Sequence, residues 1–213
     1  NRHGAAQPAP ISEPQAAPVI IAGFGRYGQI VGRALFAQGL QCTVLEHDAD
    51  LIEAIRPLGF RVFYGDATRL DVLRVAGAEH ARVLVVAVDD MAQNLQVVDL
   101  AREHFPHLQI VARARDVPHW NALRDRGVQR VERELFESSL RSARSVLEVL
   151  GLSPHEARPE LMRFRRHNLA LFERMHPHYK DRATSMALAR EGRRQPEEQL
   201  AREREERIQR RTP

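Results

Sequence analysis

Three closely spaced glycines, Gly23, Gly25 and Gly28, carry the clearest chemical signal in the sequence. They follow the apolar run at residues 19–22, with the spacing of turns that bind dinucleotides. In such a turn the first glycine allows a tight bend, the second lets the backbone approach a phosphate, and the third lets the next helix pack on the strand. The phosphate lies on the N-terminal amides of that helix. The sequence therefore predicts a phosphate-binding turn.

A carboxylate follows the glycines at the spacing expected for ribose recognition. Glu46 ends the next apolar run, 18 positions after Gly28. A carboxylate at about this spacing accepts hydrogen bonds from the adenosine ribose of a bound dinucleotide. Because its negative charge disfavours a 2′-phosphate, AMP, NAD or NADH fits better than NADP. The alternative is a strand-to-helix turn without a ligand, followed by a solvated carboxylate at a strand end.

The surrounding sequence alternates strand-like and helix-like segments. Strand-like runs occur at residues 19–22, 43–45, 61–64, 83–88, 109–112 and 128–131. Helical periodicity occurs between them, near residues 26–38, 48–57, 69–76, 90–104 and 116–126. This alternation predicts an α/β fold, a Rossmann-like doubly wound parallel sheet over residues 18–132. Residues 1–17, rich in Ala, Pro and Gln, are predicted to be a linker.

The chain after residue 132 reads as a helical extension, with interface and ligand-binding helices predicted over residues 133–180. A heptad-like apolar stripe runs through Phe136, Leu140, Ala143, Leu147 and Leu150. This stripe either covers the sheet or, widened by Val146 and Val149, forms a homodimer contact. A second helix carries Asn168 on an otherwise apolar line. This amide either sets the register of a helix pair or reaches a polar ligand.

The last segment, residues 181–213, is predicted to be a charged, frayed tail. Opposite charges stand there at the i, i+4 spacing that supports a solvated helix. The pairs are Glu198 with Arg202, Glu203 with Arg207 and Glu206 with Arg210. The net charge of +4 and pI near 9.9 do not indicate nucleic-acid binding, because 32 basic residues are interleaved with 28 acidic ones. The tail also lacks aromatic residues on which bases stack.

Cysteine, apolar and histidine content exclude further classes of protein. Cys42 is the only cysteine, so no intrachain disulfide can form, and a buried unreactive thiol in a reducing compartment is expected. The longest apolar run, residues 83–88, is far shorter than the ~20 residues that span a bilayer, so a soluble chain is expected. Two histidine pairs lack nearby cysteines and zinc-site spacing, and no metal site is predicted. The pairs are His104 with His107 and His176 with His178.

Several strings of the sequence together resemble a known family. Besides the glycine turn at residues 20–29, they are Phe-Tyr-Gly-Asp-Ala-Thr at 63–68, Ala-Arg-Ala-Arg-Asp at 112–116 and Glu-Arg-Glu at 132–134. They resemble the cytosolic potassium-transport nucleotide-binding domain, also called the KTN, RCK or TrkA-N-like domain. His-Phe-Pro-His-Leu-Gln at 104–109, followed by residues 112–116, narrows the resemblance to the bacterial Kef glutathione-gated potassium-efflux systems. The resemblance covers roughly residues 18–175.

This resemblance implies a regulator rather than an enzyme. Such a domain lies at the cytoplasmic face of the bacterial inner membrane, below a potassium/proton antiport module of the same protein. It holds transport shut while glutathione is bound, and electrophile adducts of glutathione release the block. The implied cofactor is AMP or NAD(H), with glutathione as the regulatory ligand. The expected partners are the membrane module, a second copy of the chain and an ancillary quinone-oxidoreductase-like protein.

The resemblance also implies the residues of two sites. Nucleotide contacts are expected from Gly23, Phe24, Gly25, Arg26, Tyr27, Gly28, Glu46, Asp66, Ala67 and Asp89. Glutathione contacts are expected from Arg33, Arg133, Asn168 and Asp116. Arginine binds carboxylates in a bidentate manner, and an asparagine amide pairs with peptide groups, which suits glutathione. Without the resemblance, Arg33 reads as a solvated helix residue. Arg133 reads as a weak surface partner of Glu132 or Glu137.

One position departs from the Kef pattern. Kef proteins often place an aromatic residue before the glycine that precedes the third strand, whereas this chain has Leu58 before Gly59. If the bulk of a glutathione adduct acts by displacing that aromatic ring, the smaller side chain of Leu58 would transmit a weaker gating response.

An NAD-dependent oxidoreductase is the alternative function, because the same glycine turn serves such enzymes equally well. Two observations count against it. The ~50 residues between the last strand and the charged tail are too few for a substrate domain. No sequence motif places a proton donor.

Overall fold

The computed structural model describes residues 7–211, except for the side chains of residues 207, 208, 210 and 211. Residues 1–6 of the predicted linker, and the side chains of Arg207 and Arg210 in the predicted tail pairs, therefore lie outside the described residues. The chain divides into two compact units, residues 1–134 and 135–213.

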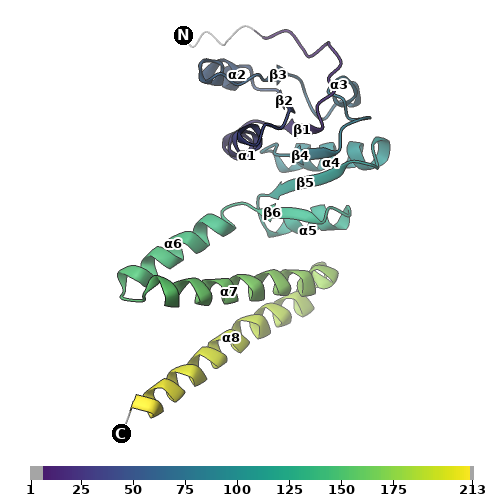
Figure 1. The fold of residues 1–213 in the computed structure, drawn as a ribbon. Coiled ribbons are helices and arrows are strands. Elements are labelled where there is room, and N and C mark those ends of the chain that lie inside the picture. The colour runs from purple at the N-terminus through teal and green to yellow at the C-terminus, as the bar shows by residue number, and fades with distance from the viewer. Residues whose placement is uncertain (1–6, 212–213) are drawn as a thin grey trace, which may run out of the picture. The chain divides into compact units, whose positions relative to one another are not determined.

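The first unit is built on a six-stranded parallel sheet with the strand order β3-β2-β1-β4-β5-β6 (Figure 1). Its strands are β1 (Val19–Ala22), β2 (Cys42–Glu46), β3 (Phe63–Tyr64), β4 (Val83–Val86), β5 (Gln109–Ala114) and β6 (Arg130–Arg133). In the centre of the sheet, Ile21 pairs with Val44 on one side and Val85 on the other. This strand order is that of a Rossmann doubly wound sheet, so the predicted fold class is confirmed.

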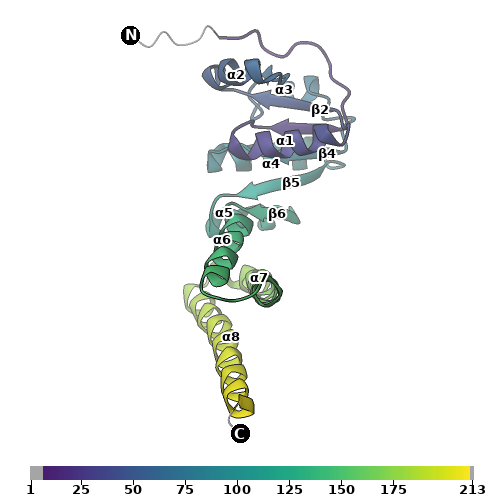
Figure 2. The same ribbon diagram turned by 60° about the vertical axis from the view of Figure 1, so that its left-hand side comes forward.

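Helices connect the strands and cover both faces of the sheet. They are α1 (Arg26–Ala37), α2 (Ala49–Ile55), α3 (Leu70–Val75), α4 (Met91–His104) and α5 (Val117–Asp125), with a 3₁₀ turn η1 (Arg56–Leu58) after α2. In Figure 2, α1 lies in front of the strands and α4 behind them. The strand predicted at residues 128–131 is shifted as a whole, because β6 begins at Arg130 and ends at Arg133. Val128 is instead tied to the end of α5, because its N–H donates to the Leu123 carbonyl.

The core of this unit forms where β1 is covered by α1. All four residues of β1 are buried, which explains their continuous rather than alternating apolar pattern. Phe24, which follows β1, is fully buried, and its ring meets the Phe60 ring edge to face at 5.2 Å between centroids. The core thus fixes the end of β1 where the glycine turn begins.

Part of the predicted linker lies along the first unit. Pro10 forms a parallel bridge with Tyr64, and the Ile11 N–H donates to the Tyr64 carbonyl at 2.8 Å. Further along, the Gln15 N–H donates to the Val75 carbonyl at 2.9 Å. These contacts place the segment beside β3 and α3.

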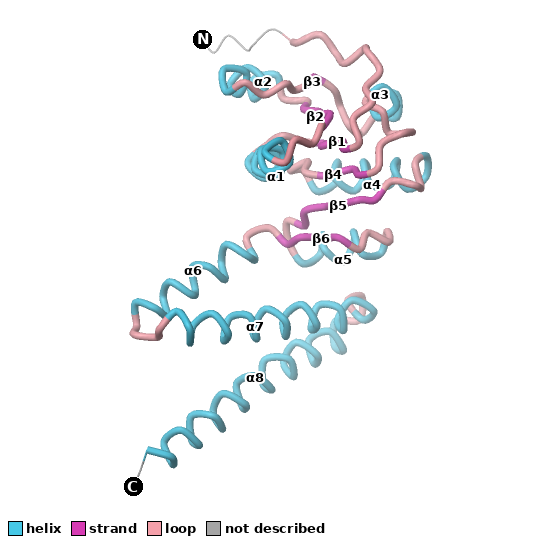
Figure 3. The backbone as a smooth tube through the Cα atoms, viewed as in Figure 1, coloured by secondary structure: helices cyan, strands magenta, loops and turns pink. Residues whose placement is uncertain are grey.

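The second unit is helical, with α6 (Phe136–Val149), α7 (Pro154–Met175), a 3₁₀ turn η2 (His176–His178) and α8 (Arg182–Arg211) (Figure 3). Ser153 and Glu156 form a capping box that starts α7. The guanidinium of Arg165 on α7 reaches Glu137 on α6 at 2.7 Å. Among the described residues, no helix is both long and apolar enough to cross a bilayer.

The segment predicted to be a frayed tail is helical to Arg211 and is attached to α7. Pro196 has no N–H, so it cannot donate to the carbonyl of Gly192 one turn earlier. The ring of His167 on α7 fills this role, with Nε2 2.6 Å from that carbonyl. Arg163 on α7 also pairs with Glu203 on α8 at 3.0 Å. The attachment depends on tertiary contacts, which charge spacing along α8 does not reveal.

Candidate functional site

The glycine turn is formed by an unusually close approach of three backbone segments. Gly23 has a φ of +95°, and a Cβ built on it would lie 2.8 Å from the backbone of Ala87 and Val88. A Cβ on Gly28 would lie 2.3 Å from the carbonyl oxygen of Gly23. Any larger residue at Gly28 would push α1 away from β1, which is the packing role predicted for the third glycine.

The N-terminus of α1 is open to an anion. Gly25 is its N-cap, and neither a capping side chain nor an acidic residue occupies the first turn of this 12-residue helix. The unpaired amides and the positive end of the helix dipole therefore face the end of β1. Such a terminus binds phosphate without needing a cationic side chain.

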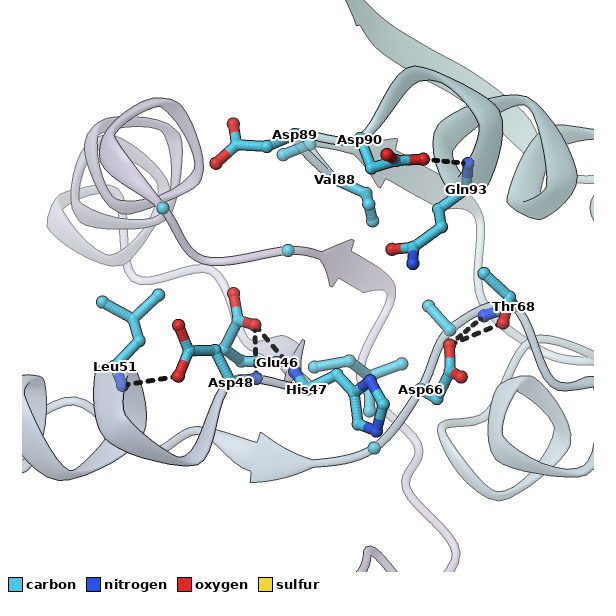
Figure 4. A pocket seen from close by; sticks show the side chains of 16 residues that line it. Glu46, His47, Asp48, Leu51, Asp66, Thr68, Val88, Asp89, Asp90 and Gln93 are labelled. Atoms are coloured by element: carbon cyan, nitrogen blue, oxygen red, sulfur yellow. Dashed lines mark hydrogen bonds between the residues drawn. The ribbon is translucent and has the colours of Figure 1, made fainter. Parts of the chain in front are cut away.

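Glu46 is held rigidly beside this turn. Its Oε1 accepts the Phe24 N–H at 3.0 Å, and its Oε2 accepts the N–H groups of His47 at 2.7 Å and Asp48 at 2.9 Å. A carboxylate has about four lone-pair positions, so about one remains on Oε1. Figure 4 shows the carboxylate fixed at the edge of the pocket. The arrangement leaves Glu46 able to accept one further hydrogen bond, as from a ribose hydroxyl.

A pocket of about 270 Å³ lies at the carboxyl ends of the strands, across the switch point between β1 and β4 (Figure 4). Ligands bind at this place in open α/β sheets, and the volume is at the small end of the roughly 300–1,000 Å³ usual for such sites. Six of the residues predicted to contact nucleotide line it: Gly23, Gly25, Glu46, Asp66, Ala67 and Asp89. These predicted residues come from separate parts of the sequence, and the fold brings them together.

The other four predicted nucleotide residues support the turn from behind or beside it. Phe24 contributes its backbone N–H, while its ring is buried in the core. Gly28 lies under the turn, and Arg26 begins α1 with an exposed side chain. Burial raises the pKa of Tyr27, and the nearby Glu132 raises it further, against the opposing charge of Arg113. The Tyr27 side chain is therefore a neutral phenol at physiological pH.

Sequence reasoning missed several lining residues. Asp48 and Asp90 each cap a helix, accepting N–H groups in the first turns of α2 and α4. Thr68 donates its N–H and its hydroxyl to Asp66, at 2.9 and 2.6 Å. An aspartate just before a helical segment is a recognisable capping signal, so Asp48 and Asp90 could have been placed from sequence.

Arg113 was also missed as a site residue. It is the fifth residue of β5, its side chain is only 6% exposed, and its Nη2 lies 2.6 Å from Oδ1 of Asp89. The guanidinium carbon lies 5.3 Å from the centre of the Tyr27 ring. A buried cation thus stands directly behind the rim of the pocket. The available signal was an arginine within the buried strand, flanked by Ala112 and Ala114.

The predicted glutathione residues occupy three elements of the first unit and one of the second. Arg33 is exposed on α1, and Arg133 ends β6 half-buried, in register with Ala114. Asp116 caps α5 and accepts the His119 N–H at 2.8 Å. Asn168 is half-buried on α7 in the second unit. Their role toward glutathione stays a prediction.

Two further sequence expectations concern single side chains. Cys42 begins β2 and is half-buried rather than buried, and burial raises the pKa of its thiol, which disfavours the nucleophilic thiolate. Leu58 in η1 is 66% exposed.

Family models match both units. The TrkA-N domain model matches residues 19–134, and the model of the potassium efflux system KefB C-terminal domain matches residues 138–213. The glutathione-regulated potassium-efflux system protein KefC of Escherichia fergusonii is 56% identical over 157 residues, covering 74% of this chain and 25% of that protein. The chain therefore spans about a quarter of the length of this relative.

Solved structures of Kef and TrkA-N domains are also similar to this chain. The Kef C-terminal domain of Shewanella denitrificans, solved in an AMP-bound form, is 40% identical, with a TM-score of 0.69 over 75% of this chain and 97% of that one. The TrkA-N domain of the inner membrane protein ybaL from Escherichia coli is 26% identical, with a TM-score of 0.54 over 64% of this chain and 98% of that one. The chain thus belongs to the TrkA-N domain family and, as the sequence resemblance predicted, to the Kef C-terminal domains.

Proposed function

We propose that this domain binds an adenine nucleotide, AMP or NAD(H), and senses glutathione and its adducts to gate potassium efflux. The observation that carries the nucleotide part is the pocket itself. The open N-terminus of α1 offers backbone amides to a phosphate, and Glu46 is held ready for a ribose hydroxyl. The AMP-bound relative from Shewanella denitrificans supports the same ligand class.

Gly25→Ala tests nucleotide binding without destroying the fold. Gly25 has a φ of −75°, which alanine adopts freely, and the nearest heavy atom to a new Cβ is 3.4 Å away. The methyl group would nonetheless stand where the backbone should approach a phosphate. We expect calorimetric titration with AMP to lose most binding, at an unchanged melting temperature. Gly39→Ala lies outside the pocket lining at a φ of +73°, so it should lower the melting temperature but leave AMP affinity unchanged. Unchanged AMP affinity in Gly25→Ala would contradict the proposal.

Glutathione binding is proposed for Arg33, Arg133, Asn168 and Asp116. Two arginines suit the two carboxylates of glutathione, and an amide suits its peptide groups. Calorimetric titration of glutathione, and of an S-substituted adduct, into AMP-loaded protein should weaken in Arg133→Ala. Arg130→Ala, an exposed arginine at the start of the same strand, is the matched control. Equal binding by both variants would remove Arg133 from the site.

Self-association is proposed through the apolar stripe of α6. No residue of α6 is buried, and Val146 and Val149 are 57% and 86% exposed. A second copy of the chain would cover these side chains. Sedimentation should show a dimer that Leu140→Asp converts to a monomer. A monomer before and after the substitution would overturn this contact.

Regulation of transport, rather than catalysis, is proposed as the activity of this domain. The chain covers a quarter of its KefC relative, which leaves room for a membrane potassium/proton antiport module above it. The same proposal places the domain at the cytoplasmic face of the inner membrane, with an ancillary quinone-oxidoreductase-like protein as a further partner. Steady NADH oxidation with small carbonyls or quinones would contradict regulation and favour the oxidoreductase alternative.

A further inference from the structure

The pocket is lined by more acidic than basic side chains, although the proposed ligand is an anion. Its carboxylates are Glu46, Asp48, Asp66, Asp89 and Asp90. All of them except Asp89 accept backbone N–H groups, which fix their positions. Within residues 7–211, the hydrogen bond accepted by Asp89 comes from the side chain of Arg113. Asp89 is therefore the carboxylate that can turn away without uncapping a helix or opening a turn.

Asp89 stands next to the place where a phosphate would lie. Its side chain is 75% exposed, and its Oδ2 is 3.4 Å from the Cβ position of Gly25, the N-cap of α1. Figure 4 shows Asp89 directed toward α1 and away from Asp90. A phosphate on the α1 amides would therefore meet a like charge at short range, which is unfavourable near a protein surface.

Arg113 has hydrogen-bonding capacity that Asp89 does not use. Its Nε is buried without a hydrogen-bond acceptor among the described residues, and lies 4.0 Å from Oε2 of Glu134. The Tyr27 ring supports the guanidinium on one side. A buried cation needs a counter-charge, and the Glu134 carboxylate can supply it when Asp89 leaves, while the Tyr27 ring holds the guanidinium in place. Arginine is also well suited to phosphate, because its fork of donors binds two oxygens together.

We propose that Asp89 and Arg113 form a charge-reading pair that makes the pocket select nucleotides by their 5′-phosphate. Without a ligand, Asp89 neutralises Arg113. When a phosphate arrives on α1, Asp89 turns toward solvent and Arg113 donates to the phosphate in its place. Asp89 thus repels a phosphate, and Arg113 attracts it. This inference rests on the proposed nucleotide binding and adds how the same pocket recognises its ligand.

The test is calorimetric titration of AMP and of adenosine into nucleotide-stripped protein. Asp89→Asn removes the repulsion at an exposed position, and should tighten AMP binding roughly three- to tenfold while leaving adenosine unchanged. Arg113→Gln should weaken AMP about 10- to 100-fold and adenosine little, as expected for loss of a charged hydrogen bond. Asp99→Asn and Arg126→Gln are matched controls, because these residues form a 2.7 Å ion pair outside the pocket lining. Neither control should change the ratio of AMP to adenosine affinity.

The outcomes separate this inference from the proposed function. An Asp89→Asn variant with an unchanged affinity ratio would overturn the charge-reading pair, and so would equal loss of AMP and adenosine in Arg113→Gln. If Arg113→Gln does not fold, the ratio of AMP to adenosine affinity in the exposed Asp89→Asn variant still tests the proposal. Wild-type protein that binds neither adenosine nor AMP would instead remove the nucleotide site itself.

Discussion

The two units of the chain bury their apolar side chains to very different extents. In the first unit, central strand residues such as Ile20 and Leu84 are completely inaccessible. Among the described residues of the second unit, the buried apolar side chains are Ala157 and Leu171, whereas Val149 is 86% exposed. Because apolar burial is the main source of folding free energy, the first unit is equipped to fold from its own sequence. The second unit leaves much of its apolar surface exposed.

The contacts within the second unit are correspondingly polar. Arg163 pairs with Glu203, and Arg165 with Glu137, at side chains that are partly exposed. Such exposed pairs contribute only about 0–1 kcal/mol each. The comparison therefore indicates a stable first unit followed by helices of lower intrinsic stability.

The largest expected effect separates the two units directly. Leu84→Ala in β4 should lower the free energy of unfolding by about 2–5 kcal/mol, because it leaves a cavity in a closed core. Val149→Ala should change it by no more than about 0.5 kcal/mol in dilute protein. Urea unfolding followed by Trp120, the single tryptophan and a buried residue of the first unit, measures the first change. Similar losses in both variants would contradict the proposed difference between the units.

A smaller effect tests how α8 is held to α7. Pro196→Ala restores an N–H to the helix interior and should stabilise α8 by up to about 3 kcal/mol. His167→Ala should cost about 1 kcal/mol alone, because the Gly192 carbonyl loses its donor. It should cost much less when Pro196→Ala is also present, since the helix then satisfies that carbonyl itself.

Native-state hydrogen exchange of the α8 amides measures this double-mutant cycle. His178→Ala, at an exposed histidine of η2, controls for loss of a ring elsewhere in the unit. Additive effects of the two substitutions would mean that His167 does not act through Gly192. The Trp120 transition should be unchanged throughout, because the first unit does not share this contact.

The sequence was sufficient for the individual strands and for the glycine turn, because local patterns of residues mark both. Apolar periodicity located all six strands, and the spacing of Gly23, Gly25 and Gly28 located the turn. The pair formed by Asp89 and Arg113 was not predicted, since these residues are 24 positions apart. Their contact exists only because β4 and β5 pair in one particular register.

The helices of the extension were also predictable from local patterns, whereas the contact that attaches α8 was not. Apolar spacing located α6 and α7, while the charge pattern of the tail indicated a frayed helix. The attachment of α8 depends on a contact between residues 25 positions apart, and on the missing N–H of Pro196. No local pattern encodes which side chain will supply the missing donor.

The smallest expected effect is a pH dependence confined to the first unit. His119 is 1% exposed, its Nδ1 accepts the Arg115 N–H at 3.0 Å, and its Nε2 lies 3.0 Å from Oδ1 of Asn94. Nε2 therefore carries the proton of a neutral ring, and a second proton on Nδ1 would break the bond to Arg115. Asn94 in turn holds the Val88 carbonyl at the pocket wall, 3.1 Å away.

Burial lowers the pKa of His119 below 6.5, against a raising effect of Asp116 and with a smaller lowering by Arg113 and Arg126. Because the unfolded chain then binds the proton more readily, the His119 contribution to stability is complete above about pH 6.5 and declines as the pH falls toward the folded pKa. The slope cannot exceed about 1.4 kcal/mol per pH unit for one proton. Urea unfolding of the Trp120 signal at pH 8 and at pH 5.5 should lose this difference in His119→Gln but keep it in His80→Gln, an exposed control. A pH dependence that survives His119→Gln would assign the acid sensitivity of the first unit to other groups.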